Sequence, residues 1–120
     1  MRKLKLYGEK KIFGPFKRKG FIAEVFVVDG KVVVESKDKK VKEELQKEIE
    51  EDIKNNAITL SRGVWEEWPD GRKVHYHLAE PKKPTDPDFL EAVRDYSALW
   101  DTHTFGGYEI SGLLSKITED

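Results

Sequence analysis

Cysteine is absent from this chain, and none of its apolar runs approaches the ~20 residues that a membrane-spanning helix needs. The lack of cysteine excludes disulfide scaffolds, thiolate zinc sites, iron–sulfur clusters and cysteine nucleophiles. The first residues, Met1-Arg2-Lys3-Leu4-Lys5-Leu6, lack the apolar segment of a secretory signal. We therefore expect an intracellular, cytoplasmic protein. The high Lys and Glu content is compatible with a thermophilic source.

Net charge is small, −1 over 120 residues, but it is unevenly distributed. Residues 1–20 carry eight Lys and Arg and one Glu, a net charge of +7. Residues 86–120 carry two basic and eight acidic side chains, a net charge of −6. The basic segment either serves as an arm for an anionic partner or is solvated and attracted to the acidic segment. The length fits one domain spanning residues 1–120.

A β-hairpin is the clearest local pattern. Phe21 to Val28 and Lys31 to Lys37 are rich in β-branched residues and flank Asp29-Gly30, a pair typical of a type I′ turn. This turn places Val28 opposite Lys31 and Glu24 opposite Glu35. One face of the hairpin then carries the expected core residues Ala23, Val25, Val27, Val32 and Val34. The other face carries Ile22, Glu24, Phe26, Val33 and Glu35.

A second hairpin is predicted between Ala57 and Glu80, turning at Pro69-Asp70-Gly71. In the simplest register Trp65 lies opposite His75 and Gly63 opposite His77. The face expected to join the core carries Ile58, Leu60, Val64, Val74, Tyr76 and Leu78. Trp65 and Trp68, near the turn, serve either as interface anchors or as cover for the edge of the core.

Two helices are predicted around this hairpin. The first begins at a capping Asp38, ends near Asn55 and presents a four-residue apolar repeat of Val41, Leu45, Ile49 and Ile53. The second begins at Asp86-Pro87 and ends near Trp100. The last segment, residues 108–118, fits a short helix better than a strand.

The N-terminal residues around Leu4 and Leu6 predict a short strand, followed by a basic loop over residues 8–20. Together these elements predict an α+β fold: an antiparallel sheet of two β-hairpins plus the N-terminal strand, with both helices packed on one face. The order is βββαββα followed by a C-terminal helix or strand. If the last segment is a strand, a split βαβ, ferredoxin-like layout is the alternative.

The sheet face left uncovered by helices is the main candidate site. Phe26 and Trp65 on this face would stack on bases, while Lys17, Arg18 and Lys19 of the basic loop would contact phosphates. This pattern favours a small binding module for nucleic acid. The same face could instead form a homodimer interface, giving a structural homo-oligomer, or be covered by the basic loop through Phe13 and Phe16.

A metal-dependent hydrolase is the alternative from another functional class. His75 and His77 share one face of a strand, and His103 from a later loop would complete a site for zinc or another divalent ion. Glu24 or Glu35 would act as base. The opposed Glu24 and Glu35 are otherwise expected to be neutralised by Lys3 and Lys5.

Other catalytic signatures are missing from the sequence. It has no G-x-S-x-G elbow, phosphate-binding loop or dinucleotide fingerprint, and no RNP1 or GXXG pattern of RNA-binding domains. We therefore expect an interaction module rather than an enzyme, with no cofactor other than a possible divalent metal, and we assign no catalytic residue.

Overall fold

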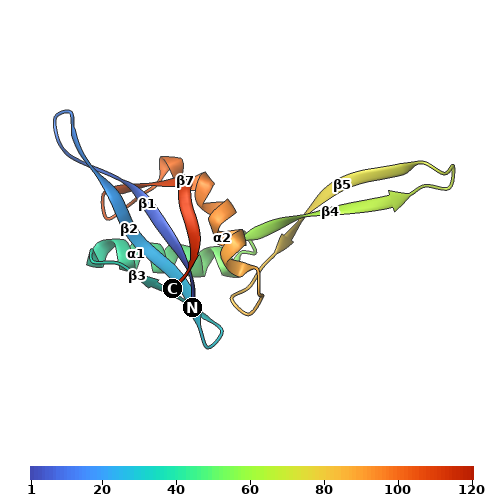
Figure 1. The fold of residues 1–120 in the computed structure, drawn as a ribbon, viewed down its shortest axis with the longest axis horizontal. Coiled ribbons are helices and arrows are strands. Elements are labelled where there is room, and N and C mark those ends of the chain that lie inside the picture. Colours follow the sequence, from blue (N-terminus) through green and yellow to red (C-terminus); the bar gives the residue numbers. More distant parts are fainter.

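The chain folds into a main antiparallel sheet, two helices and a separate two-stranded ribbon (Figure 1). The computed structural model describes residues 1–120, apart from the side chains of residues 101 and 102. The main sheet has the order β3-β2-β1-β7-β6, and β4 and β5 form the ribbon. The elements are β1 (Arg2–Phe13), β2 (Phe16–Val28), β3 (Lys31–Glu35), α1 (Lys39–Lys54), β4 (Thr59–Glu67), β5 (Lys73–Pro81), α2 (Phe89–Ser97), a 3-10 helix η1 (Ala98–Thr102), β6 (Thr104–Phe105) and β7 (Tyr108–Glu119). The predicted α+β class with an antiparallel sheet is confirmed.

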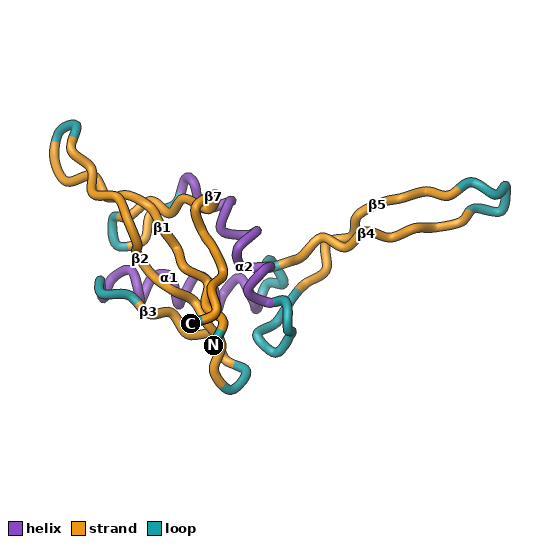
Figure 2. The backbone as a smooth tube through the Cα atoms, viewed as in Figure 1, coloured by secondary structure: helices purple, strands orange, loops and turns teal.

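Both helices pack on one face of the main sheet and form the core with it (Figure 2). The sheet contributes Leu4, Leu6, Val25 and Val34, all fully buried. The helices contribute Val41, Leu45, Ile49, Phe89 and Val93, none more than 1% exposed. Burial of each such side chain stabilises the fold by about 1.5–3 kcal/mol. The opposite face of the sheet has no helix over it.

The first predicted hairpin is confirmed in both turn and register. Asp29 and Gly30 have φ values of 50° and 74°, as a type I′ turn requires, and Glu24 lies opposite Glu35. The predicted position of Ile22 on the uncovered face is wrong. A β-bulge between the pairs Leu6–Ala23 and Tyr7–Phe21 inserts Ile22 as an extra residue, and its side chain turns into the core at 6% exposure.

Helix α1 also follows its prediction. The Asp38 side chain accepts hydrogen bonds from the backbone N–H groups of Lys40 and Val41 at 2.9 and 3.3 Å. The helix ends at Lys54, and Asn56 then adopts a positive φ of 55°.

Helix α2 is shorter than expected and begins later, at Phe89. Its axis continues as the 3-10 helix η1, where Trp100 is 1% exposed. Among the described residues, no helix has the length and apolar character needed to cross a membrane.

Residues 8–20 are not a loop. They are the outer half of a long β1–β2 hairpin that stays paired as far as Phe13 opposite Phe16 and turns at Gly14-Pro15. The lysines and glycines of this segment hide the alternating pattern. The hairpin forms because β1 is the central strand of the sheet and is held on both sides, by β2 and β7.

The C-terminal segment is a strand, β7, rather than the favoured helix. It pairs with β1 along two stretches that are separated by the unpaired residues 112–115. Gly112 permits this bulge, since a Cβ there would lie 2.5 Å from the Ala98 backbone. The bulge interrupts the two-residue period, which explains why Ile110, Leu113, Leu114 and Ile117 had the spacing of a helix.

The second predicted hairpin has the expected register but not the expected place. Trp65 lies opposite His75 and Gly63 opposite His77. However, β4 and β5 do not join the main sheet, so the ferredoxin-like alternative is wrong. The ribbon projects from the body (Figure 1), and of its expected core residues only Ile58, at its base, is fully buried. Tyr76 and Leu78 are 37% and 46% exposed.

Candidate nucleic-acid interface

The two predicted stacking residues are not on one surface. Phe26 lies on the uncovered face of the main sheet, with the Lys3 ammonium 5.1 Å from its ring centroid. Trp65 lies on the separate ribbon, stacked on His75 at 4.6 Å between centroids. The prediction that they form one platform is wrong because it assumed that both hairpins belong to one sheet.

Ion pairs cross the uncovered face of the main sheet. Lys3 contacts Glu24 at 3.2 Å, as expected, whereas Lys5 contacts Asp120 at 2.8 Å. Glu35 is instead neutralised by Lys42 of α1 at 3.5 Å. Apolar side chains lie beside these ion pairs, among them Phe21, which is 50% exposed and packs against Tyr7.

The strongest concentration of positive charge is the outer half of the β1–β2 hairpin, residues 8–20, here called the basic arm. It carries five basic side chains and one acidic one, a net charge of +4. The basic residues are Lys10, Lys11, Lys17, Arg18 and Lys19. The arm projects from the end of the molecule opposite the ribbon (Figure 1). The three predicted phosphate-binding residues thus lie together on a paired two-stranded ribbon.

Like charges face each other across this arm. Lys10 is directly opposite Arg18, and Lys11 is directly opposite Lys17. Such cross-strand pairs of like charge destabilise a hairpin. Glu9 offsets part of the repulsion, with carboxylate oxygens 3.1 Å from Lys17 and 3.9 Å from Lys19. Among the described side chains, Lys11 and Arg18 have no carboxylate within ion-pair distance, so the arm retains uncompensated positive charge.

The tip of the arm is apolar and exposed. Phe13 and Phe16 are 69% and 60% exposed, with ring centroids 5.3 Å apart. Ile12 beside them is 60% exposed. The alternative in which the two phenylalanines fold back over the sheet is wrong, because the paired strands hold the tip away from the body.

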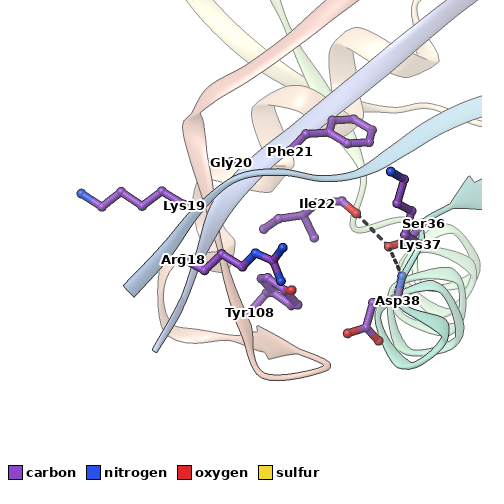
Figure 3. Close-up of a pocket in the computed structure, with 9 residues that line it drawn as sticks. All are labelled: Arg18, Lys19, Gly20, Phe21, Ile22, Ser36, Lys37, Asp38 and Tyr108. Carbon is purple, nitrogen blue, oxygen red and sulfur yellow. Dashed lines mark hydrogen bonds between the residues drawn. The ribbon is translucent and has the colours of Figure 1, made fainter. Parts of the chain in front are cut away.

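A hollow of about 510 Å³ lies at the base of the arm (Figure 3). Arg18 and Lys19 line it from the arm, Tyr108 from β7, and Lys37 from the segment before α1. Its wall is fixed by the Ser36 hydroxyl, which donates to the Ile22 carbonyl at 2.8 Å and accepts from the Asp38 N–H at 3.2 Å. Lys37 adds one cation of the body to those of the arm, and Asp38 adds one acidic side chain to the same hollow.

The histidines do not form the predicted metal site. The His75 and His77 rings lie together on the ribbon, 4.9 Å between centroids. His103, in contrast, follows η1 and precedes β6 in the body. No three metal-ligating side chains among the described residues come together. The proposed bases Glu24 and Glu35 lie on the main sheet, away from the ribbon.

Sequence reasoning missed four residues of this arm. Lys10, Lys11, Phe13 and Phe16 were assigned to a loop and not to the site. The available signal was the approximate mirror symmetry of Lys-Lys-Ile-Phe-Gly-Pro-Phe-Lys-Arg, which is typical of a hairpin with an aromatic tip.

No protein-family model, no curated protein sequence and no solved structure matches this chain.

Proposed function

We propose that the protein binds nucleic acid through the basic arm. The observation that carries the proposal is the pairing of like charges along a two-stranded ribbon that ends in two exposed phenylalanines. Polyanion binding would relieve the repulsion between Lys11 and Lys17 and release the counterions of the phosphates. Contact with phosphates therefore stabilises the arm more than contact with water does.

The shape of the arm favours a groove of duplex DNA. A two-stranded β-ribbon fits the major groove, and apolar wedges at ribbon tips enter between base steps in the minor groove. Side chains alternate between the faces of a strand, so Lys11 and Lys17 point to one side and Lys10 and Arg18 to the other. Cations on both faces suit a groove with a phosphate backbone on each side. A flat anionic membrane surface would favour cations on one face only.

The test measures binding of a fluorescently labelled DNA duplex by anisotropy at several salt concentrations. The test variant is Lys17→Gln/Arg18→Gln/Lys19→Gln. The control variant, Lys31→Gln/Lys47→Gln/Lys54→Gln, removes the same charge around a different hollow, between β3 and α1. Each lost phosphate contact lowers the slope of log K against log salt by about 0.9.

We expect the arm variant to lose at least tenfold in affinity and about two to three units of salt slope. The control variant should bind like the native chain. Equal losses in both variants would indicate attraction to overall charge and would contradict the proposal. Binding to anionic phospholipid vesicles, without binding to DNA, would reassign the arm to membranes.

A further inference from the structure

The ribbon has one strand edge that lacks the usual protection against pairing. Native proteins protect exposed edges with charges, proline, bulges or short strands. The β5 edge has nine residues in regular register, and the six from Val74 to Ala79 include no charged residue, glycine or proline. The β4 edge, by comparison, carries Arg62, Gly63, Glu66 and Glu67. The two edges of the same ribbon therefore differ in their readiness to accept another strand.

The hydrogen bonds at the two ends of the ribbon define which backbone groups are free. The Trp68 N–H donates to the Arg72 carbonyl at 2.8 Å, and the Lys82 N–H donates to the Ile58 carbonyl at 2.9 Å. Hydrogen-bonded and non-hydrogen-bonded pairs alternate along an antiparallel ladder. Even-numbered residues of β5 thus bond to β4, while the N–H and C=O groups of its odd-numbered residues point outward. These outward residues are Lys73, His75, His77 and Ala79.

We propose that β5 pairs with β5 of a second copy of this chain, antiparallel, about a two-fold axis at Tyr76. In this register His75 and His77 make the new backbone hydrogen bonds with the partner's His77 and the partner's His75. Val74 then faces the partner's Leu78 on the opposite side of the sheet. The result is a four-stranded sheet with the order β4-β5-β5-β4.

Charge complementarity selects both the occupant and the register. With the axis at Tyr76, Arg72 lies opposite the partner's Glu80, and the same pair recurs on the other side of the axis. Within its own chain Glu80 has two long ion-pair contacts, to Lys82 at 3.8 Å and Arg62 at 4.0 Å, and Arg72 contacts Asp70 at 2.6 Å, so pairing across the axis gives Arg72 and Glu80 each an additional partner of opposite charge. If the axis lay at His77 instead, Glu80 would face the partner's Val74. If it lay at His75, Glu80 would be in register with the partner's Asp70, which carries the same charge.

A second copy also supplies the strands that a two-stranded ribbon needs for stability. Isolated two-stranded ribbons are marginally stable in water, and three or more strands are needed for independent stability. This ribbon leaves Tyr76 and Leu78 37% and 46% exposed. Pairing of β5 with its copy supplies the missing strands. This inference is independent of nucleic-acid binding, because the basic arm lies at the other end of the molecule.

The experiment uses disulfide cross-linking, for which the native chain is a clean background since it has no cysteine. The test variant is Tyr76→Cys and the control is Val64→Cys, its direct cross-strand neighbour on β4. At the two-fold axis the two residues at position 76 form a non-hydrogen-bonded pair about 4.5 Å apart, within the range of disulfide geometry. Both substitutions remove an exposed or half-exposed side chain, so the body should fold in each variant.

We expect mild oxidation to convert Tyr76→Cys into a covalent dimer at least tenfold faster than Val64→Cys. Sedimentation equilibrium of the native chain should give twice its 13.9 kDa mass. Ala79→Lys, which places a lysine opposite the partner's Lys73 on each side of the axis, should shift the chain to monomer, whereas Ser61→Lys on the other edge should not. Faster cross-linking at position 64, equal rates at both positions, or a monomeric native chain would overturn the proposal.

Discussion

A buried carboxylate makes the stability of the fold depend on pH. Asp52 of α1 is 8% exposed, and its Oδ2 has no hydrogen-bond partner among the described residues. Burial, followed by the charge of the neighbouring Glu48, raises the pKa of Asp52 to about 6, against the opposing effect of Tyr96. Burial and the Asp52 charge in turn raise the pKa of Tyr96 to about 12. The folded state therefore binds a proton at Asp52 more tightly than the unfolded chain does.

The pKa of Asp52 predicts the direction of a stability change with pH. In the unfolded chain this carboxyl titrates near pH 3.9. Because the folded pKa is higher, the stabilisation is complete below about pH 4 and is lost as the pH rises through about 6. Asp52→Asn removes the charge, so it should raise the free energy of unfolding at pH 7.5 by on the order of 2 kcal/mol relative to the native chain. Urea unfolding at pH 4.5 and 7.5 checks this, and the gain should be much smaller at pH 4.5.

Glu43→Gln is the matched control for that experiment. It removes one negative charge from the same helix at a solvent-exposed position, where the side chain is 64% exposed. Its effect on unfolding should be small and nearly independent of pH. A gain for Asp52→Asn that did not change with pH would contradict the role of its ionisation.

One glycine determines where the basic arm leaves the body. At Gly8, between β2 and β7, a Cβ would overlap the Glu109 carbonyl oxygen and lie 2.6 Å from Ile22 Cδ1. We predict that Gly8→Ala destabilises the fold by about 1–3 kcal/mol, as overpacking does in other cores. Gly14→Ala is the comparison, since no atom lies within 4 Å of that position and its strain, from a φ of +53°, is confined to the exposed tip. Thermal unfolding of both variants separates a body defect from a tip defect.

At the scale of elements, the tip of the basic arm is predicted to contribute to binding without contributing to folding. Phe13 and Phe16 are mostly exposed, so Phe13→Ala/Phe16→Ala should leave the melting temperature within a few degrees of the native value. Contact of each ring with a base is worth about 1–3 kcal/mol, so the affinity for labelled DNA should fall at least tenfold. Anisotropy titration measures this loss directly.

Phe21→Ala is the control for the tip variant. Phe21 is 50% exposed on the uncovered face of the main sheet, where it packs edge-on against Tyr7 at 5.9 Å. DNA binding should tolerate its loss. If Phe21→Ala weakens binding as much as the tip variant does, then the sheet face, and not the arm, is the binding surface.

The elements that could be predicted from sequence are those defined by local chemistry. Asp29-Gly30 determined its own turn and the register of the five residues on either side. The capping Asp38 and the apolar side chains that recur every four residues after it determined α1. Which sheet a strand joins depends on distant residues, and this is where prediction failed. The alternating apolar residues of β4 and β5 were correctly paired with each other, but the pattern contains no information about whether a third strand lies beside them.

Only part of the candidate site could be predicted, because local properties can be read from the sequence and sheet membership cannot. Lys17, Arg18 and Lys19 were identified from charge density, which is a local property of the sequence. Phe26 and Trp65 were placed on one face by assuming a common sheet, which is a property of the whole fold. The bulge at Ile22 had no sequence signal beyond the nearby Gly20, so the inward rotation of the Ile22 side chain could not be anticipated.

At the scale of the whole molecule, body and ribbon are predicted to be separable. The core lies within the main sheet, α1 and α2, and the ribbon adds to it only at its base, through Ile58 and Leu60. Replacing residues 63–77 by Asn-Gly keeps that base and closes it with a favoured hairpin turn. The shortened chain should melt within a few degrees of the native one and bind DNA with unchanged affinity. Differential scanning calorimetry and anisotropy check this, and loss of the folded state would show that the ribbon belongs to the cooperative unit.

The extended outline of the molecule has a consequence for its hydrodynamic behaviour. A compact chain of 120 residues has a radius of gyration of about 14 Å, whereas this molecule has 17.0 Å and extents of 63 × 37 × 27 Å. Since apparent volume scales with the cube of the radius, one copy should elute from a sizing column like a compact protein of about twice its mass. Deleting the ribbon should therefore delay elution by far more than the lost mass accounts for, even in a chain that never associates.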